Sequence, residues 1–137
     1  MSIEAFQIEY HKDFEKEFER LAVKKKFKKL PDQIIEIVSE FEHGKFSGDK
    51  IAHSDFPIPH DVYKMRLPNP DANVGKSNGY RVIYMVVMET KTVIIFIIYY
   101  KKEQPTVSDT YINGLIDGYF LNSLPEEELN QDDRNGE

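Results

Sequence analysis

The alternation of apolar and polar positions predicts a strand at the start of the chain and a helix directly after it. Within residues 3–10 the apolar side chains recur at every second position, which is the period of a strand, at Phe6, Ile8 and Tyr10. Asp13 is typical of a helix cap. Apolar residues then follow at helical spacing up to about Lys26, at Phe14, Phe18 and Leu21.

A second helix is predicted from Pro31 to Gly44. Proline suits the first turn of a helix because its missing N–H is not needed there, and glycine is a common stop signal. The apolar positions between them predict the buried stripe Ile34, Ile35, Val38 and Phe41. The two helices therefore form a helical hairpin that packs through one apolar seam.

A long segment without a period, residues 45–60, predicts a loop with a short strand at residues 50–52. Alternating and β-branched runs then predict three more strands, at residues 62–67, 80–88 and 92–100, with a tight turn at 89–91. The last run, TVIIFIIYY, is apolar on both faces, which indicates a central strand covered on both sides. Ser108 is a suitable cap for a final short helix.

The order of these elements predicts an α+β domain, in which a small antiparallel sheet packs with the helical hairpin and a short C-terminal helix. With 137 residues, we expect one domain over residues 1–122 and an acidic, disordered tail over residues 123–137. The absence of cysteine excludes a disulfide scaffold and a cysteine nucleophile. Neither a signal peptide nor a membrane-spanning run is predicted, so we expect a soluble, cytoplasmic protein.

Charge is distributed unevenly along the chain. The formal net charge is −6, but residues 61–102 carry 7 basic and 3 acidic side chains, whereas residues 123–137 carry 1 and 6. The middle of the chain is therefore basic although the whole is acidic. The tail is interpreted either as a solvated end or as a segment that screens a basic site.

The basic residues of this middle segment fall on the predicted strands and on the loop between them. Lys64 and Arg66 are two residues apart, so they project from the same face of one strand. Arg81 begins the next strand, Lys76 lies in the loop between these two strands, and Lys101 and Lys102 close the third strand. Several cations with nearby tyrosines on one sheet face suit phosphodiester chemistry, because cations stabilise charge that builds on the phosphorus. The alternative is that they only solvate an exposed face.

Other motifs are weaker. The sequence GKS at residues 75–77 is not a nucleotide-binding P-loop, because Pro70 stands where that motif needs a glycine. The histidines and acids of the 45–60 loop have no spacing that fixes a metal geometry, so no metal site is predicted. The run KKKFKK at residues 24–29 is interpreted as a complement to the negative end of its helix, with contact to RNA as the alternative.

Three segments together resemble the toxins of the RelE/ParE superfamily, in particular ribosome-dependent mRNA interferases of the RelE/HigB type. The resemblance covers about residues 61–116 and rests on the order and spacing of its motifs. These are YKMRL at 63–67, GKSNGYRVIY at 75–84 and IIYYKKEQPTVSD at 97–109.

The resemblance implies the toxin of a type II toxin–antitoxin module, with a twisted antiparallel sheet and two N-terminal helices on it. It implies a cognate antitoxin that covers the basic face, and mRNA with the ribosome as further partners. The implied reaction is attack by a ribose 2′-OH on the adjacent phosphate, without metal or other cofactor, and no membrane or lipid partner is implied.

The resemblance also implies roles for individual residues. Lys64 and Arg66 match the family's basic strand pair, and Arg81 matches the arginine expected to contact the scissile phosphate. The remaining matches are to basic or substrate-side positions, at Lys76, Lys101, Lys102 and Tyr111. A lysine acts as general base only if neighbouring cations lower its pKa, and Lys64 is the candidate.

Two alternatives stay open at this stage. The first is a ParE-like toxin that inhibits gyrase, which would bind a protein and would not need a phosphate-stabilising cluster. The second is a non-catalytic protein-interaction domain on the same fold, because a fold does not fix a function. Salt-dependent RNA binding separates the second alternative from an RNase.

Overall fold

A computed structural model describes residues 5–51 and 60–122 of the chain. The chain divides into two compact units, Met1–Thr106 and Val107–Glu137. The first unit contains the sheet and the two N-terminal helices, and the second contains the helix α3 (Asp109–Asn122). The fold is α+β, as predicted.

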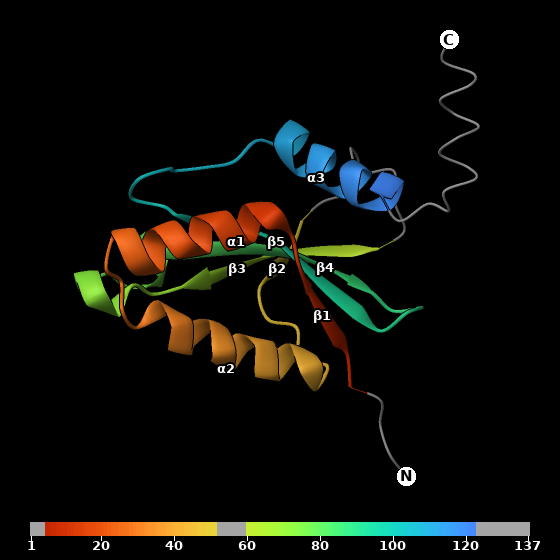
Figure 1. Ribbon diagram of the computed structural model, residues 1–137, viewed down its shortest axis with the longest axis horizontal. Helices are drawn as coiled ribbons and strands as arrows, with labels where there is room; N and C mark the ends of the chain where they lie inside the picture. The colour runs from red at the N-terminus through yellow and green to blue at the C-terminus, as the bar shows by residue number, and fades with distance from the viewer. Residues whose placement is uncertain (1–4, 52–59, 123–137) are drawn as a thin grey trace. The chain divides into compact units, whose positions relative to one another are not determined.

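The sheet has five strands in the order β1-β5-β4-β3-β2 (Figure 1). Their bounds are β1 Gln7–Tyr10, β2 Asp49–Lys50, β3 Asp61–Leu67, β4 Tyr80–Val87 and β5 Thr92–Tyr100. Strands β2 to β5 pair antiparallel, but β1 runs parallel to β5 at the edge. The prediction of a wholly antiparallel sheet of about four strands was therefore wrong in this respect. A period of two identifies a strand but carries no information on the direction of its partner.

The predicted helical hairpin is confirmed. It consists of α1 (Lys12–Glu19), which continues as one π-helical turn, η1 (Arg20–Lys24), and of α2 (Leu30–Glu42). The cap of α1 was predicted wrongly. His11 caps the helix, because its Nδ1 accepts a hydrogen bond of 3.0 Å from the Asp13 N–H, and Asp13 lies in the first turn.

The buried stripe of α2 agrees with the predicted one at Ile34 and Phe41, and Val38 is half-buried against the core, but Ile35 was predicted wrongly. Ile35 is 67% exposed, whereas Ile37 is buried, together with Leu30, Ile34 and Phe41. Ile35 and Ile37 both neighbour the stripe in sequence, and only the rotation of the helix against the sheet selects between them. Gly44 ends the helix in a left-handed conformation, as its position predicted.

Both N-terminal helices pack on one face of the sheet. Alternate strand residues such as Met65, Val82 and Ile95 join the helix residues in this core. The intervening strand positions project to the opposite face. The sheet therefore has a helix-covered face and a second face, and the distinction decides which side chains meet at the candidate site.

Some predictions concern residues that the structure does not describe. These are the last residue of the strand expected at residues 50–52, the loop residues His53 and Asp55, and the tail 123–137, whereas Lys50 lies in β2. In the second unit, the Ser108 Oγ accepts a hydrogen bond of 3.1 Å from the Tyr111 N–H, so the predicted cap of the last helix is confirmed. Within residues 5–51 and 60–122, no helix has the length and apolar character needed to cross a membrane.

A network of ion pairs ties the hairpin to the turn that follows β5. The Glu103 carboxylate pairs with the Arg20 guanidinium and lies 3.0 Å from the Lys25 Nζ. Arg20 also pairs with Glu17 on its own helix at 2.8 Å. The hydrogen bond from Arg20, with a further one from Lys25, lowers the pKa of Glu103 below its ordinary value.

We predict that Glu103→Gln lowers stability near neutral pH and that this loss disappears in acid. Because the folded-state pKa of Glu103 is lowered, the carboxylate stabilises the fold above the unfolded-state pKa, and this contribution is lost as the pH falls through the folded-state value. The free energy of unfolding, measured by urea titration from acidic to neutral pH, should differ between wild type and variant near neutrality and converge in acid. Glu19→Gln is the control, because it removes an acid that forms no ion pair among the described residues. Its free energy of unfolding should differ little from that of wild type at every pH.

Candidate functional site

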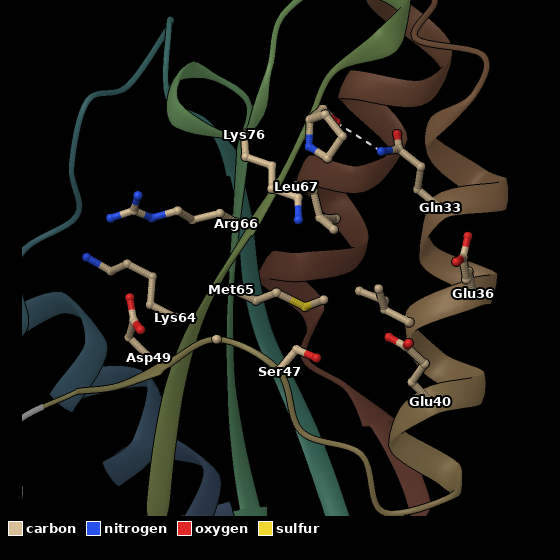
Figure 2. Close-up of a pocket in the computed structure, with 13 residues that line it drawn as sticks. Gln33, Glu36, Glu40, Ser47, Asp49, Lys64, Met65, Arg66, Leu67 and Lys76 are labelled. Carbon is tan, nitrogen blue, oxygen red and sulfur yellow. Dashed lines mark hydrogen bonds between the residues drawn. The ribbon is translucent and has the colours of Figure 1, made fainter.

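Cationic side chains from β3 and β4 gather on the second face of the sheet. In the strand register, Arg66 on β3 lies opposite Arg81 on β4, and Arg81 lies opposite Tyr99 on β5. Lys64 lies two residues before Arg66 and projects to the same face, away from α2 (Figure 2). The structure thus brings three of the predicted site residues into one region, with a tyrosine beside them.

The Arg81 side chain is almost fully buried, with 4% of its surface exposed. Its Nη1 donates hydrogen bonds to the carbonyl oxygens of Lys76 at 2.8 Å and Tyr80 at 3.2 Å. Its Nη2 donates to the Ser77 carbonyl oxygen at 2.8 Å. The guanidinium therefore holds the 3₁₀ turn η3 (Lys76–Asn78) against the start of β4, in addition to carrying a charge.

The cations of this face are not neutralised within the described residues. Burial, together with the charge of Arg66, lowers the pKa of Arg81 below its ordinary value, although an arginine stays protonated. Like charges directly opposite one another weaken a sheet. In the described part of the chain, none of Lys64, Arg66 and Arg81 on this face forms an ion pair, nor does Lys76 in the adjoining loop. We call these four residues the cation cluster. An anion bound here would relieve the repulsion.

Gly79 fixes how the loop that carries Lys76 approaches β3. A Cβ at position 79 would lie 2.1 Å from the carbonyl oxygen of Leu67, so only glycine fits this close contact. The Gly79 carbonyl oxygen also accepts a hydrogen bond of 2.9 Å from the Lys101 N–H. The sequence Gly-Tyr-Arg thus brings the loop, the end of β5 and the buried Arg81 together. Lys101 and the exposed Lys102 follow at this end of the sheet.

A groove of about 650 Å³ lies between β3 and α2. Figure 2 shows Met65 pointing across the groove toward α2, whereas Lys64 and Arg66 point to the other side of the strand. Lys76 extends from the loop toward Leu67 at one end of the groove. The complete lining is Gln33, Glu36, Ile37, Glu40, Ser47, Gly48, Asp49, Lys64, Met65, Arg66, Leu67, Pro68 and Lys76.

The groove is also lined by acids that the sequence did not single out. Glu36 and Glu40 lie one turn apart on α2, and Asp49 pairs with Lys64 in the register of β2 and β3. The two glutamates are four residues apart on a predicted helix, and this spacing was the signal in the sequence that could have identified them as neighbours. Tyr99 was missed as well, because its position beside Arg81 depends on the strand register.

The remaining candidates from the sequence are Tyr111, the potential metal ligands and the GKS motif. Tyr111 belongs to the second unit, on α3. His60 and Asp61 are described, but no group of three potential metal ligands occurs in the portion of the chain that the structure covers. The loop that holds GKS is followed by β4 and includes the short turn η2 (Pro70–Ala72), so it is not arranged as a P-loop.

No family model and no curated protein matches the sequence. Among solved structures, the chain is similar to the isolated E. coli RelE toxin, with 20% sequence identity and a TM-score of 0.46 over 82% of this chain and 98% of that one. It is also similar to a chain of the intact E. coli RelBE toxin–antitoxin complex, with 22% identity and a TM-score of 0.45 over 70% and 96% of the two chains. An archaeal RelE–RelB complex from Pyrococcus horikoshii OT3 shows 20% identity and a TM-score of 0.41 over 71% and 96%.

Proposed function

We propose that this protein is a RelE-type toxin of a toxin–antitoxin module and cleaves mRNA as an endoribonuclease. The observation that carries the proposal is the cation cluster, in which Arg66 and Arg81 lie opposite each other in the strand register and form no ion pair with any acid of residues 5–51 or 60–122. Such a cluster is electrostatically unfavourable alone and favourable with a phosphate between its members. The motifs that resemble the RelE/ParE superfamily are the segments that supply these residues.

The proposed reaction is an internal transesterification. A base removes the proton of a ribose 2′-OH, the 2′-oxygen forms a bond to the adjacent phosphorus, and the bond from phosphorus to the 5′-oxygen of the next nucleotide breaks. The leaving oxygen takes up a proton, so the products are a 2′,3′-cyclic phosphate and a free 5′-OH. Charge increases on the non-bridging oxygens in the transition state, and positioned cations stabilise it there.

The residues of the cluster take different parts in this proposal. Arg66, which forms no ion pair within the described residues, holds the scissile phosphate, and Lys76, which extends from the loop toward the adjacent groove, contacts a neighbouring phosphate. Arg81 fixes the turn that carries Lys76 through its hydrogen bonds to that turn, and its buried charge adds to the positive potential at the site. Lys64 is the candidate base, and Lys101 with Lys102 contacts the flanking phosphates. The cognate antitoxin would cover this face with an acidic segment, and the ribosome would present the mRNA.

Arg66→Gln tests the function without disturbing the fold, since the Arg66 side chain is exposed and forms no hydrogen bond within the described residues. Wild type, induced in a bacterial host, should arrest growth and create new mRNA 5′ ends within translated codons. Arg66→Gln should reduce these ends by about 10²-fold, the usual effect of removing one group that stabilises the transition state. Lys16→Gln, on the exposed side of α1, is the control with the same change of charge and should behave as wild type.

Other results would redirect the assignment. Growth arrest by the wild type without new 5′ ends would contradict the RNase and favour the gyrase-inhibiting alternative. Absence of both effects would favour a protein-interaction domain that has kept the fold. Equal cleavage by wild type and Arg66→Gln would retain an RNase but remove the cation cluster from its site.

A further inference from the structure

The connection between the two N-terminal helices has a fixed backbone. It carries the run Lys24–Lys29, in which Lys26 adopts a left-handed conformation with φ of 60°. The Phe27 N–H donates to the Leu21 carbonyl oxygen at 3.2 Å, and the Leu30 N–H donates to the Phe27 carbonyl oxygen at 3.1 Å. The lysines are therefore displayed on a structured turn. We call the four without an ion pair, Lys24, Lys26, Lys28 and Lys29, the lysine turn.

Phe27, in the middle of this run, anchors it to the end of the sheet. Its ring lies 6.1 Å from the ring of Tyr80 and 5.4 Å from that of Tyr100, measured between centroids. Tyr80 and Tyr100 are paired in register, and Arg81 and Lys101 follow them in sequence. Figure 1 shows the connection between α1 and α2 at the same end of the sheet as the loop between β3 and β4. The lysine turn and the cation cluster thus flank one end of the first unit.

Two of the acids near the lysine turn are already engaged. The Glu103 carboxylate pairs with Arg20 and Lys25, and the Asp71 Oδ2 accepts a hydrogen bond of 3.0 Å from the Lys29 N–H. All members of the lysine turn are exposed, and none forms an ion pair within the described residues. Repulsion among so many lysines is tolerated at a surface but favours an anionic partner with several regularly spaced charges.

We propose that the lysine turn is a second contact surface for the RNA backbone, which binds phosphates beyond the one held at the cation cluster. This inference rests on the proposed function and extends it from one scissile phosphate to a longer strand. Lysines commonly contact phosphates as point charges, but they are depleted at protein–protein interfaces, which are anchored by aromatic and other apolar side chains. The aromatic residue here, Phe27, is turned inward onto the tyrosines, and the exposed apolar neighbour is the aliphatic Val23. RNA is therefore favoured over an acidic protein.

The test compares two RNAs that differ in length. The full chain is titrated with a short oligonucleotide that fills only the cation cluster and with a long unstructured RNA, at several salt concentrations. Lys24→Gln combined with Lys28→Gln should weaken binding of the long RNA and reduce the slope of log K against log salt by about 1.4, since each phosphate contact to a single strand contributes about 0.7. Binding of the short oligonucleotide should stay as in wild type.

Lys12→Gln combined with Lys16→Gln is the matched control, because it removes two exposed lysines from α1. It should leave the slope for the long RNA unchanged. Equal slopes for the lysine-turn variant and the wild type would overturn the inference, even if cleavage had been established. So would equal losses in the test and control variants, which would reflect net charge alone.

Two further measurements separate this inference from the proposed function. If Arg66→Gln abolishes cleavage or short-oligonucleotide binding but keeps the lysine-dependent slope for long RNA, the second surface is supported independently of the site. If long RNA still binds through the lysine turn while wild type cleaves nothing, the inference stands and the proposed function fails. If polyglutamate displaces the long RNA at equal charge concentration, the surface selects acidic polypeptides and the assignment to RNA is overturned.

Discussion

Replacing Arg81 with lysine is expected to remove most of the RNA cleavage although the positive charge is kept. The guanidinium donates to the carbonyl oxygens of Lys76, Tyr80 and Ser77 at once, with distances of 2.8 to 3.2 Å. A lysine ammonium on a flexible stem lacks the planar fork that makes these bonds together. We therefore expect a fall in kcat of about 10²–10³-fold for Arg81→Lys, comparable to the loss of a group that stabilises the transition state directly.

The measurement is cleavage of a defined RNA under single-turnover conditions, with the free energy of unfolding determined for the same samples. Because Arg81 is buried, some loss of stability is expected, and rates are compared only at temperatures where each variant is folded. Arg66→Lys is the control, since Arg66 makes no such bonds to any described residue and should tolerate the exchange much better. Full cleavage by Arg81→Lys would show that the fork is dispensable and that Arg81 acts only through its charge.

Lys64→Ala separates the proposed base from the phosphate-binding residues. If Lys64 removes the 2′-OH proton, its loss should reduce cleavage and flatten the dependence of the rate on pH, without weakening RNA binding as strongly as a loss of Arg66. Intact cleavage by Lys64→Ala, together with abolished cleavage by an Arg81→Ala variant, would remove Lys64 from the mechanism. The acids Glu36 and Asp49 in the adjacent groove would then be the next candidates.

The positions of β3, β4 and β5 were predictable from the sequence because these strands are longer runs that contain β-branched and aromatic residues. The run at β5 agrees with the structure at both ends, and β3 and β4 agree within one residue. The basic residues of these strands could be recognised as a set for the same reason. Their neighbours could not, since a register shift between Ile83 and Tyr84 offsets the pairing with β5, and it is the pairing that places Tyr99 beside Arg81.

The role of Arg81 shows a second limit of sequence reasoning. The resemblance of Gly-Tyr-Arg to the family's motif implied a residue that contacts the substrate, but the hydrogen bonds of Arg81 to the carbonyl oxygens of a turn depend on the path of an irregular loop. The parallel pairing of β1 and the exposure of Ile35 are two further features that the local sequence pattern did not predict. Each depends on how distant segments pack, and local patterns of apolar residues do not encode that packing.

Gly79→Ala is expected to give the largest loss of stability among single substitutions near the site. The added Cβ would lie 2.1 Å from the Leu67 carbonyl oxygen and 3.0 Å from the Gly75 carbonyl oxygen, both of which are backbone atoms that cannot rotate away. The loop must then shift away from β3. We expect the free energy of unfolding to fall by about 3 kcal/mol, at the upper end of the usual cost of over-packing.

Gly75→Ala provides a control in the same loop, because a Cβ at position 75 meets no atom within 4 Å and the φ of −76° suits any residue. Urea denaturation should show wild-type stability for Gly75→Ala and a clearly lower midpoint for Gly79→Ala. The same shift would move the carbonyl oxygens of Lys76 and Ser77 that hold Arg81, so cleavage should fall even where Gly79→Ala is fully folded. If the two alanine variants were equally stable and equally active, the close approach of this loop to β3 would not be what positions the cation cluster.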